Sequence, residues 1–196
     1  MAHRLASVAR HVAGHNGRHS SACQQFSEEF EAAAGFGWHV GETSFDWKTL
    51  IANKDKELDR LEGLYQKGLA ANKADIINSR AELRGKHEVY LKSEDRVVTA
   101  EKVLIAVGGT PARSTGIDGD DLCITSDEVF HLEELPKSIV IAGGGYIAVE
   151  FACIFAGLGS KVTLVYRGEQ ILRGFDNDVR KALYEEMLEK GIDVRL

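Results

Sequence analysis

Residues 138–148 read Ser-Ile-Val-Ile-Ala-Gly-Gly-Gly-Tyr-Ile-Ala, and Lys161-Val-Thr-Leu-Val-Tyr-Arg167 follows a helical stretch that runs to Gly159. This order predicts a strand, a glycine turn, a helix and a second strand within about thirty residues. A glycine triplet alone indicates little, but in this setting it is typical of a turn that binds a dinucleotide. We therefore expect an α/β fold.

The pattern Gly143-x-Gly145-x-x-Ala148 gives each small residue its own task. Gly143 permits the tight turn, and Gly145 lets backbone N–H groups approach a pyrophosphate at the positive end of the helix. Ala148 lets the helix pack closely on the strand. The alternative is a plain turn between a strand and a helix, with no ligand.

The end of the second strand indicates which nucleotide binds. Sites for NAD usually carry an acid there that bonds the ribose 2′-hydroxyl. Here Tyr166 holds that place, and Arg167 and Arg173 follow it. Two guanidiniums suit a 2′-phosphate, with contacts worth roughly 1.5–3 kcal/mol each, so the pattern favours NADPH. The alternative is that both arginines are solvated surface charges paired with Glu169 and Asp176.

The composition of the 196 residues narrows the class of protein. Hydrophobic residues make up 44% and charged residues 28%, which excludes a disordered or collagen-like chain. The net charge of −6 argues against a general affinity for nucleic acid or an anionic membrane, and no apolar run is long enough to cross a bilayer. Cys23, Cys123 and Cys153 are widely separated, which is not a disulfide framework, so a cytoplasmic setting is expected.

Residues 1–27 form an atypical basic segment, and before Glu28 there is no acidic residue. Such a start resembles an organelle transit peptide, or a foreign start joined to another protein. His11, His15 and His19 share one face of any helix there, but no carboxylate or cysteine joins them at a ligand-like spacing. We therefore expect no metal site.

The middle of the chain has alternating helical and strand patterns. Pro136 marks the boundary before the glycine turn, and Cys153 on the helix after that turn is expected to pack against the sheet. The predicted elements are a helix over 26–35 stopped by Gly35, a long helix from Trp47 capped by Asp46, a strand within 75–84, an antiparallel meander of 87–91 and 96–99, and a strand over 101–109 buried on both faces.

Five motifs together carry a resemblance to a known family. Residues 26–196, which are 171 of the 196, resemble the glutathione reductases, a branch of the FAD-dependent pyridine nucleotide–disulfide oxidoreductases. The motifs are Gly35-Phe-Gly-Trp38, Phe45-Asp-Trp-Lys-Thr-Leu50, Val103-Leu-Ile-Ala-Val-Gly-Gly-Thr-Pro111, Gly143-Gly-Gly-Tyr-Ile-Ala-Val-Glu150, and Arg167 and Arg173 with Gly174-Phe-Asp176.

The resemblance implies parts of two Rossmann-like FAD/NAD(P)-binding domains with an antiparallel β-meander. It places an incomplete FAD-binding domain at 28–135 and the first part of an NADPH-binding domain at 136–196. It also implies glutathione disulfide as the substrate and a homodimer as the assembly. An acid at position 166 would be expected of a lipoamide dehydrogenase, while trypanothione and mercuric reductases share the arginine pattern and stay open.

The resemblance implies a role for several residues around the turn. Gly144, Ile147 and Glu150 would contact the nucleotide, and Arg167 and Arg173 would hold the 2′-phosphate. Tyr146 resembles a ring that covers the flavin and moves aside for nicotinamide. The alternative for Tyr146 is an aromatic ring packed against the next strand.

The resemblance also implies a flavin side and a substrate side. The backbone of Ala81 would meet the FAD adenine, and Ala106, Gly108 and Gly109 would form a second turn near the flavin, where Val107 replaces the usual threonine. Tyr65 would lie near bound glutathione disulfide. As an aromatic residue on a helix, Tyr65 has the alternative of a place in the core.

Several family features have no counterpart in this sequence. The chain has no Cys-x4-Cys pair and no opening Gly-x-Gly-x-x-Gly segment, and it ends at Leu196 within the NADPH part. No catalytic residue is therefore assigned. The interpretation is a fragment of a glutathione-disulfide reductase, without activity as written. The alternative is a non-catalytic NADP(H)-binding module or a gene remnant.

Overall fold

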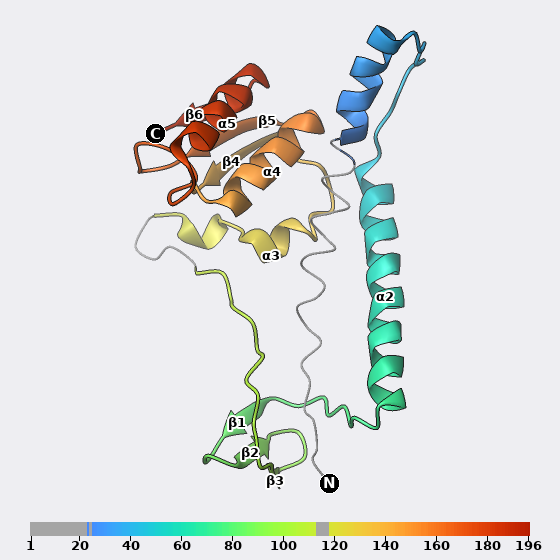
Figure 1. Cartoon of the computed structure of the whole chain (residues 1–196), viewed down its shortest axis with the longest axis vertical. Helices are drawn as coiled ribbons and strands as arrows, with labels where there is room; N and C mark the ends of the chain where they lie inside the picture. Colours follow the sequence, from blue (N-terminus) through green and yellow to red (C-terminus); the bar gives the residue numbers. More distant parts are fainter. Residues whose placement is uncertain (1–22, 24, 113–117) are drawn as a thin grey trace. The chain divides into compact units, whose positions relative to one another are not determined.

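The computed structural model describes residue 23, residues 25–112 and residues 118–196 (Figure 1). Residues 1–22 and 24 of the basic segment, which include its histidines, lie outside the described residues. The chain forms two compact units, one that includes residues 55–110 and one that includes residues 25–54 and 118–196. None of the helices in these described stretches has the length and apolar character that a membrane span requires.

The second unit contains the predicted strand, glycine turn, helix and strand. Its parallel sheet has the order β4-β5-β6, and one helix follows each of its first two strands (Figure 1). The fold is therefore α/β, as predicted, and the order of elements around the turn is confirmed. The elements are β4 (Ser138–Ala142), α4 (Tyr146–Gly157), β5 (Lys161–Val165), α5 (Asn177–Glu189) and β6 (Asp193–Arg195).

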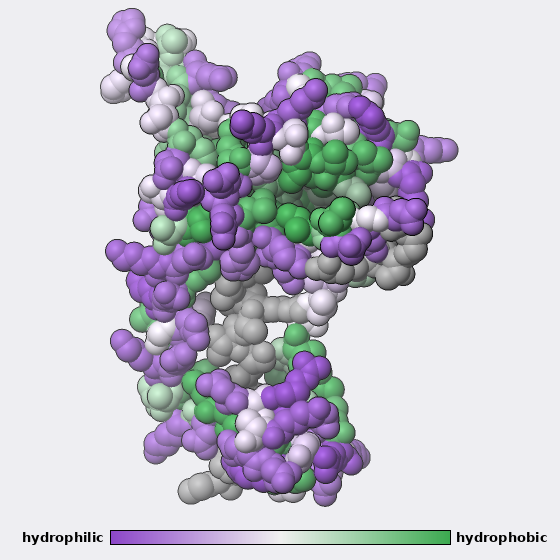
Figure 2. Space-filling model, turned by 180° about the vertical axis from the view of Figure 1, so that it is seen from behind, coloured by the Kyte–Doolittle hydropathy of each residue, from purple (hydrophilic) through white to green (hydrophobic). Residues whose placement is uncertain are grey.

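The register of the sheet places the apolar side chains on one face. Ile141 lies opposite Leu164, and Leu164 lies opposite Val194, so all three point the same way. They pack in the core with Phe155, which is 1% exposed. Val140, on the other face, is 70% exposed, and Figure 2 shows hydrophobic surface on this unit. Burial is therefore one-sided, as expected when both helices cover the same face.

The long helix α2 (Trp47–Ala71) begins where the sequence predicts. The Asp46 carboxylate accepts a hydrogen bond from the Thr49 N–H at 2.6 Å, which confirms the predicted N-cap. Trp47 stacks on Phe155 with 6.1 Å between ring centroids, and its indole N–H donates to the Leu132 carbonyl at 2.7 Å. These contacts tie the first turns of α2 to the core of the second unit.

The second unit also contains several short helical segments. Residues 25–32 are helical and continue into the 3₁₀ turn η1 (Ala33–Phe36), which ends at Gly37 with φ of 81°. The prediction of a stop at Gly35 is wrong by two residues, because Gly37 is the glycine that takes the left-handed conformation. The remaining short elements are η2 (Asp120–Leu122) and α3 (Ser126–Val129).

The first unit contains the antiparallel meander. Strands β1 (Ala81–Leu83), β2 (Glu88–Leu91) and β3 (Arg96–Thr99) pair in the order β1-β2-β3, which confirms the predicted pairing of the last two. The strand expected within residues 75–84 forms only over residues 81–83. Those three residues pair with β2, whereas 75–80 lie outside the ladder.

The prediction of a doubly buried strand over 101–109 is wrong for this structure. Residues 103–110 adopt neither helix nor strand, and Leu104 and Val107 are 83% and 72% exposed. An apolar run becomes a buried strand only when neighbouring strands bond its edges and a second layer covers its faces. Within the described part of the chain, no strand pairs with these residues.

The packing of the second unit predicts that two Phe→Ala substitutions change the free energy of unfolding by very different amounts. Phe155→Ala removes a ring that is 1% exposed, and we expect it to lower the free energy of unfolding by about 3–5 kcal/mol. Phe36→Ala removes a ring that is 84% exposed and should change it by under about 0.5 kcal/mol. Denaturant unfolding of both variants measures the difference, and equal losses would contradict the core described above.

Candidate functional site

The glycine turn connects β4 to α4 through three residues with different constraints. Gly143 has a φ of 146°, and its N–H donates to the Val165 carbonyl at 2.9 Å. A Cβ on Gly143 would lie 3.4 Å from the Cβ of Ala148. The turn is therefore tight and the helix lies close above it, as the two small residues predict.

Gly144 packs against the ring of Tyr166, which follows β5. A Cβ on Gly144 would lie 2.5 Å from Cγ of that ring, closer than any real side chain can come. A Cβ on Gly168 would also lie 2.5 Å from the ring, at Cε1. The Tyr166 ring is thus held between two glycines, one on the turn and one on the loop after β5.

Gly145 opens α4 without a side-chain cap. Its backbone is extended, and a Cβ there would meet nothing within 4 Å. The N-terminus of α4 therefore lacks a side-chain cap and has open space beside Gly145, and a helix N-terminus of this kind attracts an anion. Ile147 and Glu150 are exposed beside it, and so is Tyr146 at 60%. That exposure rules out the alternative in which the Tyr146 ring packs against the next strand.

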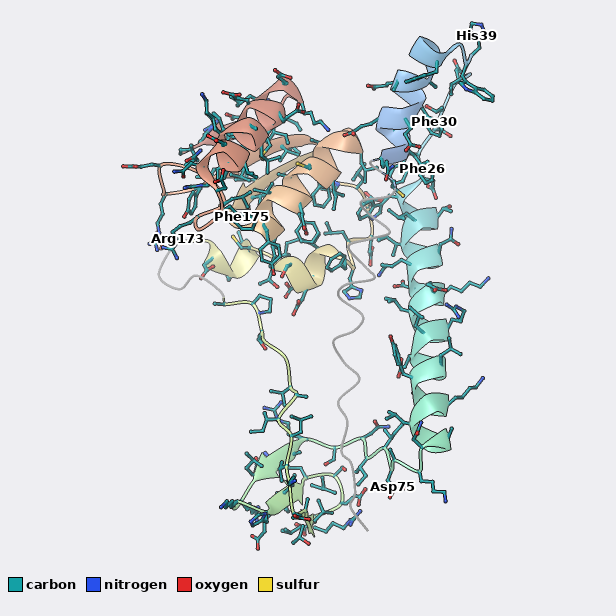
Figure 3. All side chains as sticks on the ribbon, in the orientation of Figure 1. Phe26, Phe30, His39, Asp75, Arg173 and Phe175 are labelled. Atoms are coloured by element: carbon teal, nitrogen blue, oxygen red, sulfur yellow. The ribbon has the colours of Figure 1, made fainter. Side chains whose placement is uncertain are left out.

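The loop between β5 and α5 returns to the glycine turn. The Leu172 N–H donates to the Gly144 carbonyl at 2.6 Å, so Arg173 leaves the backbone next to the turn. Figure 3 shows Arg173 pointing away from the body of the unit, near Phe175. Arg167, directly after the held ring of Tyr166, is exposed as well. The loop that carries both arginines therefore returns to the turn.

The alternative that Arg167 and Arg173 pair with nearby acids can be compared with the structure. The Asp176 carboxylate accepts from the N–H groups of Asp178 and Val179, so it caps α5. Among the described residues, Arg167 and Arg173 form no ion pair with Glu169 or with any other acid. Both guanidiniums are left available to a ligand.

One residue of this region was not predicted. Arg180, in the first turn of α5, donates from Nε to the Ile171 carbonyl at 2.7 Å and from Nη2 to the Gln170 carbonyl at 3.0 Å. Its Nη1 donates to Asn177 Oδ1 at 3.0 Å. The sequence carries no signal for this role, because an arginine on an amphipathic helix usually faces solvent.

The residues proposed for flavin and disulfide lie in the first unit. Tyr65 is on α2 and exposed, which rules out the alternative of a core residue. Ala81 is an exposed residue of β1. Ala106, Gly108 and Gly109 are exposed in the irregular stretch after β3. These positions occupy three separate stretches of backbone, and the geometry assembles no flavin site from them.

Cys23, Cys123 and Cys153 are free cysteines. Cys153 on α4 packs against the core, as predicted, and burial raises the pKa of its thiol. Burial also raises the pKa of Cys23, while Cys123 is exposed after η2. A raised pKa disfavours the thiolate that attacks disulfides. In the described residues, no group of three histidines, cysteines or carboxylates is placed to hold a metal.

Comparison with known proteins identifies the family of this chain. The sequence profile described as "Pyridine nucleotide-disulphide oxidoreductase" matches residues 3–196. The chain belongs to this family. Among the relatives of this chain is the glutathione reductase of Burkholderia cepacia, which is 46% identical over 88% of this chain. The trypanothione reductase of Leishmania donovani is 41% identical over 87%.

The chain is short beside other members of the family. It spans 38% of the Burkholderia cepacia protein and 37% of the Leishmania donovani protein. The solved structure of the HOCl-induced flavoprotein disulfide reductase RclA from Escherichia coli, in its Cu(II) complex, superposes with a TM-score of 0.74. That match has 25% identity and covers 91% of this chain and 38% of that one. The described fold is therefore one that occurs within a flavoprotein disulfide reductase.

The packing of Tyr166 predicts that the turn does not tolerate a methyl group at position 144. Gly144→Ala forces the ring away, so we expect a loss of about 1–3 kcal/mol in the free energy of unfolding. Gly63→Ala, within α2 and with nothing within 4 Å, should be neutral or stabilising by up to about 1 kcal/mol. Urea unfolding of the two variants tests this, and equal stabilities would show that the ring moves aside without cost.

Proposed function

We propose that this chain binds NADPH through residues 143–173, as the nucleotide side of a flavoprotein disulfide reductase that acts on glutathione disulfide. One observation carries the proposal. The Leu172 N–H bonds the Gly144 carbonyl, so the loop that carries Arg167 and Arg173, which form no ion pair with the described residues, closes on a helix N-terminus without a side-chain cap. A diphosphate and a 2′-phosphate need those two features side by side.

Each part of the site has a defined task in this proposal. The turn of Gly143, Gly144 and Gly145 brings the N-terminus of α4 to the diphosphate, and Ile147 and Glu150 flank it. Arg167 and Arg173 neutralise the 2′-phosphate by charge-assisted hydrogen bonds. Bound NADPH supplies a hydride, and Tyr146, which is exposed beside the turn, would cover the flavin and move aside for the nicotinamide.

The flavin and substrate parts of the proposal rest on sequence and relatives. We assign Ala81, Ala106, Gly108 and Gly109 to FAD, Tyr65 to glutathione disulfide, and a homodimer to the assembly. We also propose residues 28–135 as part of an FAD-binding domain and 136–196 as part of an NADPH-binding domain. Glutathione reductases among the relatives support this substrate, as does that of Nostoc, 44% identical over 86% of this chain. Widely spaced free cysteines support a reducing, cytoplasmic setting.

The arginine pair predicts a preference for NADPH over NADH. We expect the double variant Arg167→Ala/Arg173→Ala to remove this preference, with a loss of at most roughly 3 kcal/mol, since the two contacts share one phosphate. Affinity for NADH should hold, because NADH has no 2′-phosphate. Calorimetric titration with both nucleotides measures this. Lys161→Ala, at the opposite end of β5, is the matched control and should leave the preference intact.

Equal affinity of the unaltered chain for NADPH and NADH would overturn the assignment of Arg167 and Arg173. An equal loss of both nucleotides in the double variant would show instead that the arginines support the loop and do not read the phosphate.

The cysteines favour a second candidate, an NADP(H)-binding module that performs no disulfide chemistry of its own. Burial raises the pKa of Cys23 and of Cys153, and Cys153 packs against the core. Reduction of a disulfide by a thiol needs a reactive thiolate and a second thiol to resolve the mixed disulfide. Cys23, Cys123 and Cys153 have no such spacing.

One assay tests whether the chain by itself reduces a disulfide. With added FAD and glutathione disulfide, we expect no disulfide-dependent oxidation of NADPH by the purified chain, because a lone thiol has no resolving partner. Loss of NADPH absorbance is the readout, and a glutathione reductase of known activity is the positive control. Turnover that requires the disulfide and survives Cys23→Ser would exclude the module and establish reductase activity.

A further inference from the structure

The backbone immediately before Arg173 is held in an unusual conformation. Leu172 has a φ of 54°, the left-handed region that non-glycine residues rarely adopt. Its side chain is buried, and so is that of Ile171. Its N–H bonds the Gly144 carbonyl at 2.6 Å. A conformation of this kind persists only where its surroundings fix it from more than one side.

Arg180 fixes this segment from the side of α5. Its guanidinium bonds two consecutive carbonyls, Ile171 at 2.7 Å and Gln170 at 3.0 Å, and is itself held by Asn177 at 3.0 Å. The planar fork of an arginine matches three acceptors at once, which a lysine ammonium on a flexible stem does not. The loop before Arg173 is therefore fixed by hydrogen bonds to the Gly144 carbonyl on one side and to the Arg180 guanidinium on the other.

We propose that Arg180 is a positioning residue for selectivity toward the 2′-phosphate. It acts by setting where Arg173 leaves the backbone, and it makes no contact with the nucleotide. This inference rests on the proposed function, in which Arg173 binds that phosphate. Because Arg173 follows Leu172 directly, a loop released at Gln170 and Ile171 lets the Arg173 guanidinium sample many positions and weakens its bond to the phosphate.

A simpler effect of Arg180 has to be separated from positioning. Its positive charge attracts a phosphate at a distance, whatever its hydrogen bonds. Arg180→Lys keeps the charge and loses the fork, whereas Arg180→Gln loses both. Lys181→Gln removes the same charge from the neighbouring residue of α5, whose ammonium is 3.9 Å from Glu185 and outside the loop contacts.

The experiment measures dissociation constants of the full chain for NADPH and NADH by calorimetry, together with the thermal unfolding midpoint. We expect Arg180→Lys and Arg180→Gln each to weaken NADPH binding about tenfold and to change NADH binding less than about twofold. Lys181→Gln should change both by less than about twofold. The ratio of the two affinities is the decisive readout, since a general loss of structure lowers both together.

The outcomes separate this inference from the function on which it rests. A chain without any preference for NADPH ends both. If the unaltered chain prefers NADPH and the Arg180 variants keep that preference, only the inference about Arg180 is overturned. The same holds if Arg180→Lys binds NADPH as well as the unaltered chain does, or if the variants lose affinity for both nucleotides equally. If the Arg180 variants do not unfold cooperatively, Asn177→Ala replaces them. It removes one guanidinium contact, and we expect a two- to fourfold drop for NADPH alone, while no drop overturns the inference.

Discussion

The ring of Tyr166 occupies the space where a side chain on residue 144 would have to be. A Cβ on Gly144 would come within 2.5 Å of that ring, so the end of β5 can approach the turn only because residue 144 is a glycine. The same residue presents the carbonyl that receives the Leu172 N–H. The turn, the ring and the loop are consequently one structural unit, and the positions of Arg167 and Arg173 follow from it.

Much of this unit could be predicted from sequence, because its information is local. The strand, the glycine turn, the helix and the next strand lie within a short stretch, and the period of the apolar residues changes at each boundary. The contacts of Tyr166 with Gly144 and Gly168 could not be predicted, since they join residues that only the folded sheet brings together. Arg180 could not be predicted either, because its bonds reach back nine and ten residues from a helix to loop carbonyls.

The errors in the first unit have a different physical cause. The apolar run over 101–109 and the pattern over 75–84 correctly indicate a preference for extended backbone. A strand, however, is defined by a partner, and only residues 81–83 find one in the described chain. The end of the first helix also depends on hydrogen-bond partners that the sequence pattern does not reveal. Gly35 and Gly37 are both able to end it, and Gly37 does so because its N–H reaches the carbonyls of Ala33 and Ala34.

The geometry of the site also separates two kinds of recognition. In the proposed site, the turn at Gly143–Gly145 and the N-terminus of α4 would face the diphosphate, which NADH and NADPH share, so this part would bind both nucleotides alike. In the same proposal, only the loop after β5 would meet the 2′-phosphate by which the two differ. Selectivity would then depend on how firmly that loop is held, and affinity on the turn. Since the Gly144 carbonyl belongs to the turn and bonds the loop, the proposal implies that a change at this one residue alters both affinity and selectivity, whereas a change in α5 alters selectivity alone.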